Sequence, residues 1–234
     1  MSKRTTEIYK LIDRCTDEEK RLLLAYLRRH IPVHPLEEKW GTTAEAILTA
    51  IARSSDLTQR GIRGILAEAT FEEAILPPME SSGWKAIAIT GDQAYDFLLE
   101  RAGARVRIQV KLQRKQAGLP KEYAARSRAA LHCPTGKVFV VEVQKTRSGE
   151  KAGQKTRPYR FGDFDILAVN LQPSSGDWKR FFYTPGSWLL PRPGQPELIQ
   201  IFQPVPECPD DWWTDNLGQC IDWFLAGQNR RLYS

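Results

Sequence analysis

Two short segments decide the fold of this chain: YDFLLE at residues 95–100 and RVRIQVKLQ at residues 105–113. In the second segment apolar and polar residues alternate, which is typical of a strand that buries one face. Gln109 and Lys111 share the polar face and lie about 7 Å apart at the rise of a strand. A short Ala-Gly turn joins the two segments. We therefore expect a hairpin that brings Asp96 beside Gln109 and Lys111.

The rest of the chain predicts helices and further strands around this hairpin. Apolar residues recur at helical spacing before Gly83 and at strand spacing after it. Helices are expected at residues 20–30, 44–53, 58–76, 120–131 and 211–225, and further strands at residues 84–90, 137–145, 164–171, 180–184 and 198–203. A capping box at residues 16–19 precedes the first helix, whose predicted buried face consists of Leu22, Leu23, Leu24, Tyr26 and Leu27. The predicted fold class is α/β (α+β), with a mixed central β-sheet flanked by helices and a helical N-terminal portion.

Composition excludes several classes of protein. Hydrophobic residues make up 41% and charged residues 26% of the chain, as in ordinary soluble globular proteins. No apolar run approaches the roughly 18 residues that span a bilayer, and the start MSKRTTEIYK is unlike a secretory signal. We therefore expect a cytoplasmic protein with no membrane partner. The four cysteines lack metal-site spacing, and no phosphate-binding Gly-rich loop is present, so no nucleotide cofactor is expected.

Positive charge is concentrated in one part of the chain. The net charge is +6, but residues 101–160 carry 16 Lys and Arg against three acidic residues. The remainder of the chain is therefore net negative. A charge distribution of this kind indicates a surface that binds a polyanion such as DNA.

The hairpin residues supply the groups that phosphodiester hydrolysis requires. That reaction needs a metal ion held by oxygens near the phosphate, and a cation that orients the attacking water. Asp96 is the expected principal metal ligand. Gln109 offers its amide oxygen, or Val110 its backbone carbonyl, as a second ligand. Lys111 is expected to steady the water or the phosphate.

This arrangement resembles the PD-(D/E)XK nuclease motif, in the Q-x-K variant found in some restriction enzymes. The resemblance covers roughly residues 68–171. Tyr95 stands where the motif has Pro, and Gln109 stands where an acid is usual, which removes one negative charge from the metal site. Either a carboxylate comes from elsewhere or the site is inactive. The resemblance implies Mg²⁺ as cofactor, with Mn²⁺ able to substitute and Ca²⁺ supporting DNA binding without cleavage.

A further carboxylate is expected from the helix at residues 58–76, because members of this superfamily often add a Glu from the helix before the Asp strand. The predicted apolar stripe of that helix consists of Ile62, Ile65, Leu66, Ala69 and Leu76. Glu73 falls near the centre of this stripe and is the first choice. Glu72 at its edge and Glu68 further off stay open as alternatives.

The segment at residues 144–169 also resembles restriction enzymes, in which a basic loop leads into a core strand. The basic residues expected to contact DNA phosphates or base edges are Arg114, Lys115, Lys145, Arg147, Lys151, Lys155, Arg157 and Arg160. Asp165, at the start of the predicted strand, is interpreted as structural.

Together these features predict a magnesium-dependent type II restriction endonuclease that cleaves double-stranded DNA within a restriction–modification system. The alternatives are a repair or recombination nuclease of the same fold and a non-catalytic DNA-binding protein. We interpret residues 1–234 as one nuclease domain, with a helical subregion at 1–60, the catalytic core at 61–172 and a C-terminal part at 173–234. One motif cuts one strand, so we expect a homodimer. The chain offers apolar material for such an interface in Trp178, Trp188, Trp212, Trp213 and Trp223, although aromatic residues in such a region are more often part of the core.

Overall fold

The structure is a computed structural model of the chain. It describes residues 2–28, 30–31, 34–123, 136–145, 150–151, 154–155 and 158–233. The chain divides into two compact units, Met1–Arg60 and Gly61–Ser234. Most of the helix predicted at residues 120–131 lies outside the described residues, and Pro120 itself belongs to a short strand. No helix in the described ranges has the length and apolar character needed to cross a membrane.

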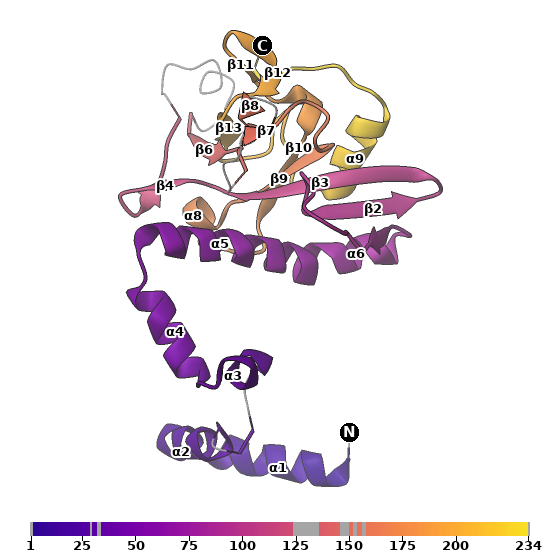
Figure 1. Cartoon of the computed structure of the whole chain (residues 1–234). Helices are drawn as coiled ribbons and strands as arrows, with labels where there is room; N and C mark the ends of the chain where they lie inside the picture. Colours follow the sequence, from indigo (N-terminus) through magenta and orange to yellow (C-terminus); the bar gives the residue numbers. More distant parts are fainter. Residues whose placement is uncertain are drawn as a thin grey trace. The chain divides into compact units, whose positions relative to one another are not determined.

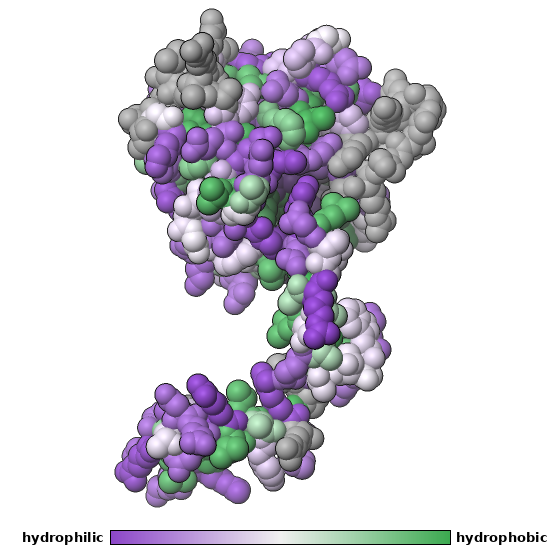
Figure 2. Space-filling view, turned by 90° about the vertical axis from the view of Figure 1, so that its left-hand side faces the viewer, coloured by the Kyte–Doolittle hydropathy of each residue, from purple (hydrophilic) through white to green (hydrophobic). Residues whose placement is uncertain are grey.

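The first unit is helical, as predicted. Its helices are α1 (Lys3–Arg14), α2 (Asp17–Arg28), α3 (Pro35–Trp40) and α4 (Ala44–Arg53), and α5 (Asp56–Thr70) begins in it. The expected capping box starts α2: the Thr16 backbone amide donates to Glu19 (2.7 Å), and the Glu19 amide donates to the Thr16 hydroxyl (3.3 Å). Most of the predicted buried face of α2 is exposed, with Leu22 at 66%, and only Leu23 on that face is partly buried. Figure 2 shows hydrophobic side chains at the surface of these helices.

The second unit is built on a mixed five-stranded sheet in the order β1-β2-β3-β9-β10 (Figure 1). Its strands are β1 (Lys85–Ile87), β2 (Phe97–Arg101), β3 (Ala104–Leu112), β9 (Ile166–Asn170) and β10 (Phe181–Pro185). The first three strands form an antiparallel meander, β9 runs parallel to β3, and β10 is antiparallel to β9. The predicted fold class, a mixed sheet with helices around it, is confirmed.

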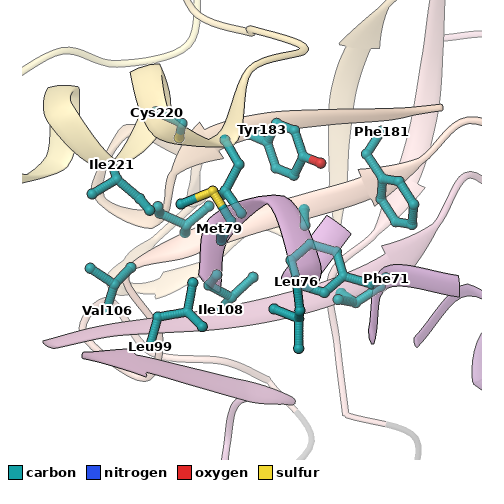
Figure 3. Close-up of a cluster of buried hydrophobic side chains, with 14 of the residues drawn as sticks. Phe71, Leu76, Met79, Leu99, Val106, Ile108, Phe181, Tyr183, Cys220 and Ile221 are labelled. Carbon is teal, nitrogen blue, oxygen red and sulfur yellow. The ribbon is translucent and has the colours of Figure 1, made fainter. Parts of the chain in front are cut away.

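Helices cover one face of the sheet. They are the continuation of α5, the π-helix η1 (Phe71–Ile75), α6 (Leu76–Ser81) and α9 (Leu217–Leu225). Figure 3 shows their side chains packed against the even-numbered residues of β3. The core on this face includes Phe71, Leu76, Met79, Leu99, Val106, Ile108, Phe181, Tyr183, Cys220 and Ile221.

The opposite face is covered by smaller β elements. The strands β6 (Val138–Glu142) and β13 (Phe202–Pro206) form an antiparallel pair there. The remaining short elements are β4 (Lys115–Gln116), β5 (Leu119–Pro120), β7 (Glu150–Lys151), β8 (Gln154–Lys155), α8 (Gln172–Ser175), η2 (Gly186–Trp188), β11 (Pro191–Arg192) and β12 (Gln195–Ile199). The single strand predicted at residues 198–203 is therefore two strands, β12 and β13. The predicted helix at 211–225 begins only at Leu217, where the Asn216 side chain caps it.

The C-terminal tryptophans belong to the core of the second unit. Trp188 and Trp213 are fully buried, and Trp188 stacks on Trp223 with 5.3 Å between ring centroids. Trp178, Trp212 and Trp223 are partly buried. This agrees with the interpretation that aromatic residues in this region belong to the core, and these tryptophans do not form an exposed dimer interface.

The helix at residues 58–76 has a different buried face from the predicted one. Ile65 and Leu66 are 63% and 46% exposed, whereas Ala67 and Phe71 are fully buried. The prediction assumed one uninterrupted α-helix. The π turn η1 sets the buried Phe71 and Leu76 five positions apart, where buried residues of an α-helix would be four apart. This extra residue rotates the helix before it relative to the stripe that ends at Leu76.

Phe71→Ala should lower the free energy of unfolding by about 3–5 kcal/mol, because it opens a cavity in a dry core. Phe71 lies 4.9 Å from Phe97 and 5.5 Å from Phe181, measured between ring centroids. Ile65→Ala on the same helix is the control and should change stability by less than about 0.5 kcal/mol. Urea denaturation of both variants measures the difference. Equal losses of stability in the two variants would mean that the predicted stripe, which contains Ile65, is buried.

Candidate active site

The candidate site begins where the hairpin strands differ in length. β2 starts at Phe97, opposite Ile108, while β3 continues to Leu112. The Asp96 amide donates to the Ile108 carbonyl (2.9 Å). Beyond that point the Val110 amide has no β2 backbone to bond, and it donates to Asp96 Oδ2 instead (2.8 Å). The Asp96 carboxylate therefore caps an open edge of β3. Burial raises the pKa of Asp96, whereas Lys111 and the hydrogen bonds from Val110 and Gln109 lower it.

Gln109 lies beside Asp96, as its spacing predicted, and is only 1% exposed. Its Nε2 donates to Asp96 Oδ2 and to the Val110 carbonyl (3.2 Å). Its Oε1 accepts a hydrogen bond from the Tyr159 hydroxyl (3.0 Å). In this orientation the amide nitrogen, and not the predicted amide oxygen, faces the Asp96 carboxylate.

Lys111 is partly buried on the same face of β3. Its ammonium lies 5.6 Å from the centroid of the Tyr159 ring. Burial lowers the pKa of Lys111, and the negative charges of Asp96 and Glu68 oppose this shift. Lys111 is therefore a desolvated amine beside an aromatic ring that interacts electrostatically with two carboxylates, which is a setting typical of functional lysines.

The helix glutamate at this site is Glu68. Burial and the nearby Asp96 raise the pKa of Glu68 to about 6, while Lys111 lowers it. Glu73, the first choice from the sequence, is exposed in the π turn. The π turn accounts for the exposure of Glu73, because the predicted stripe assumed regular α-helical spacing throughout. Glu72 is exposed as well, although it lines the adjacent cleft.

Glu68 and Asp96 line one open cleft of about 640 Å³. One wall comes from α5, η1 and α6, and the other from residues 86–89 and 96–98. The helix lies on one face of the sheet, and Lys111 lies on the other. Glu68 and Lys111 nevertheless interact electrostatically across the point where β2 ends and leaves the edge of β3 uncovered.

The donor set of this site fits a hard divalent cation. Two carboxylates, Glu68 and Asp96, influence each other in a partly buried setting, and the unfavourable interaction between them is relieved when a cation binds. The Gln109 Nε2 group donates to both the Val110 carbonyl and Asp96 Oδ2, so these two oxygens lie near one donor. In the described residues no group of three or more His, Cys, Asp or Glu side chains gathers around one point. The third oxygen would therefore come from the Val110 backbone or from an amide.

Asp165 is structural, as interpreted from the sequence. It forms a two-pronged ion pair with Arg107, with Nη2–Oδ1 and Nε–Oδ2 distances of 2.6 and 2.9 Å. The Arg107 amide also donates to Asp165 (2.8 Å), and the Asp165 amide donates to the Arg107 carbonyl (2.8 Å). These bonds hold the start of β9 against β3, two residues from Gln109.

The predicted DNA-contacting residues fall into three groups. Arg114 is paired with Glu142 and lies 5.3 Å from the Phe202 ring centroid, so it is part of the fold. Lys145 is near the site, with its ammonium 5.4 Å from the Tyr159 ring centroid and 3.7 Å from Asp163.

For the other predicted DNA-contacting residues, the structure gives only the exposure of the side chain or the position of the backbone. Lys115 is partly buried, and Arg160 is exposed. The backbones of Lys151 and Lys155 lie in the β7–β8 hairpin, while Arg147 and Arg157 lie outside the described residues.

Tyr159 is the site residue that the sequence did not indicate. It reaches Gln109 from 50 residues away in the chain and contacts both Lys111 and Lys145. It precedes the predicted strand at residues 164–171 and belongs to no motif spacing. Only the fold brings it to the hairpin.

Comparison with known proteins gives a partial likeness among solved structures. No protein-family model matches the chain, and no curated protein is similar to it at a significant level. Among solved structures, the bacterial homing endonuclease I-Ssp6803I matches with 18% sequence identity and a TM-score of 0.35. That match covers 64% of this chain and 79% of the endonuclease. A likeness of this size does not by itself assign a family or an activity.

Proposed function

We propose that this protein is a divalent-cation-dependent DNA endonuclease. The observation that carries the proposal is that Glu68 and Asp96 line one cleft at the open edge of β3, with Lys111 close enough to interact electrostatically with both. Two neighbouring carboxylates and a desolvated amine are groups that phosphodiester hydrolysis requires. The same point lies beside a chain segment with a large excess of positive charge.

Each residue has a defined role in this proposal. Glu68, Asp96 and the Val110 carbonyl would hold the cation, for which Mg²⁺ is the expected ion. When bound, Mg²⁺ supplies electrostatic stabilisation of the charge that develops on the phosphate. Lys111 donates hydrogen bonds to the attacking water or to a phosphate oxygen. The Tyr159 ring limits where the Lys111 ammonium can lie.

Lys145 is the best-placed described residue for a DNA phosphate near the site. Its ammonium shares the Tyr159 ring with Lys111, and its ion pair with Asp163 is long and partly exposed. A phosphate can therefore replace Asp163 as its partner at little cost. Double-stranded DNA is the proposed substrate, with Ca²⁺ supporting binding without cleavage and Mn²⁺ able to replace Mg²⁺.

A plasmid digest in Mg²⁺ separates the possible activities. Discrete fragments indicate a sequence-specific enzyme of the restriction type, which is the finer form of the proposal. Unspecific or structure-specific cutting indicates a repair or recombination nuclease. DNA binding without any cutting indicates a non-catalytic DNA-binding protein and contradicts the proposal.

Asp96→Asn and Lys111→Ala should each reduce the cleavage rate by about a hundredfold or more, because each removes a charge at the reacting phosphate. Asn retains an oxygen for the Val110 amide, so the fold of the first variant should be preserved. DNA binding in Ca²⁺, measured by fluorescence anisotropy, should persist in both. Cleavage at the wild-type rate by either variant would refute the assignment of the site.

Glu68→Gln should also abolish cleavage, because it removes the second carboxylate. Glu73→Gln is the matched control on the same helical segment, exposed and outside the cleft, and should cleave like wild type. Initial rates at saturating Mg²⁺ compare the two variants. The opposite pattern, with Glu73 essential and Glu68 dispensable, would restore the choice made from the sequence.

We further propose that the enzyme acts as a homodimer on DNA, since one such site cuts one strand and double-strand cleavage at a symmetric sequence requires two. Sedimentation with a cognate duplex should show two chains per duplex. Affinity should also fall steeply with salt concentration as several phosphates per subunit are neutralised. A monomer that makes double-strand breaks would require sequential nicking and would exclude this assembly.

A further inference from the structure

Tyr159 makes three contacts that all lead to the candidate site. Its hydroxyl donates to Gln109 Oε1 (3.0 Å), and its ring centroid lies 5.6 Å from the Lys111 ammonium and 5.4 Å from that of Lys145. The side chain is 4% exposed and packs edge-on against Phe164. The ring is therefore fixed by packing, and the hydroxyl has a defined position next to the Gln109 amide.

The Gln109 amide presents its nitrogen, and not its oxygen, to the candidate site. Its Nε2 donates to both Asp96 Oδ2 and the Val110 carbonyl, which are the oxygens proposed to bind the cation. A cation among these oxygens would face the partial positive charge of the amide hydrogens. A half-turn of the amide about its last side-chain bond exchanges Nε2 and Oε1 and removes this repulsion.

Such a half-turn needs a partner that accepts either end of the amide. A phenol hydroxyl is both a donor and an acceptor, so it can donate to Oε1 or accept from Nε2. A buried amide without such a partner would leave one polar atom unsatisfied in one of the two orientations. In the described residues, the only hydrogen bond recorded for Gln109 Oε1 comes from Tyr159.

We propose that Tyr159 is the positioning residue of Gln109, and that it permits the Gln109 amide to present Nε2 to Asp96 without a cation and Oε1 to the cation when one binds. This inference rests on the proposed function, because it takes a cation as the ligand of the site. It explains how a glutamine serves at a position where the related motif has an acid.

Binding of Ca²⁺ to the full chain, measured by calorimetry, tests the inference without relying on cleavage. Tyr159→Phe keeps the ring and removes the hydroxyl. It should weaken Ca²⁺ binding about fivefold, equivalent to about 1 kcal/mol, the usual contribution of one hydrogen bond. Without the hydroxyl, Gln109 Oε1 lacks its donor in the cation-free protein, and Nε2 lacks its acceptor once the cation binds. Cation binding is weakened because an unpaired buried N–H costs more free energy than an unpaired carbonyl oxygen. Tyr233→Phe is the control: it removes another buried hydroxyl, bonded to Asp210 (2.8 Å), and should leave the Kd for Ca²⁺ unchanged.

A double-mutant cycle shows whether Tyr159 acts through Gln109. In a Gln109→Ala background, Tyr159→Phe should have no further effect on the Kd for Ca²⁺. The side-chain NH₂ signals of Gln109 in ¹⁵N NMR spectra, identified by their absence from Gln109→Ala, should shift when Ca²⁺ is added to the wild-type protein. A wild-type Kd for Tyr159→Phe, an equal loss in both backgrounds, or unmoved Gln109 signals would each overturn the inference.

The two proposals fail in different ways. If the wild-type protein binds Ca²⁺ with the expected changes but never cuts DNA in Mg²⁺, the nuclease proposal falls and the role of Tyr159 stands. If the wild-type protein cuts DNA while Tyr159→Phe matches it in the Kd for Ca²⁺, the role of Tyr159 falls alone. If the wild-type protein binds no Ca²⁺, the amide inference falls, and cleavage in Mg²⁺ then decides the nuclease proposal independently.

Discussion

The hydrogen bond from the Val110 amide to the Asp96 carboxylate is the interaction on which the site depends. This bond forms because β3 extends beyond the start of β2, so that the Val110 amide has no backbone acceptor on β2. A buried backbone donor must be satisfied, so a side chain at the start of β2 takes the place of main chain. As a result, the Asp96 carboxylate lies at a partly buried sheet edge. Gln109, Lys111 and Glu68 are placed near Asp96 because of the same open edge.

Features that depend on neighbouring residues could be predicted from the sequence. The alternation in residues 105–113 defined β3 and its two faces, because strand periodicity is local. The short turn after Arg101 then determined that Asp96 would lie near Gln109. The Thr16 capping box and the start of α4 at Ala44 were predicted for the same reason. The outline of the sheet and the hairpin half of the site are therefore visible in the sequence.

Features that depend on irregular geometry or on distant residues could not be predicted. The π turn at Phe71–Ile75 has no periodic signature, and it changed which glutamate faces the site. Tyr159 meets Gln109 only through the pairing of β9 with β3. Composition counts basic residues but does not show which of them are committed to the fold, as Arg107 and Arg114 are.

The parallel pairing of β3 with β9 has a consequence for the order in which the molecule is assembled. Asp96 and Gln109 are 13 residues apart and belong to one hairpin, whereas Arg107 and Asp165 are separated by 58 residues. Closing the longer loop costs more chain entropy and comes later in folding. During synthesis the hairpin leaves the ribosome well before β9 does. The carboxylate and amide can thus meet before Tyr159 and Asp165 have been synthesised, and these two residues join the site only once β9 pairs with β3.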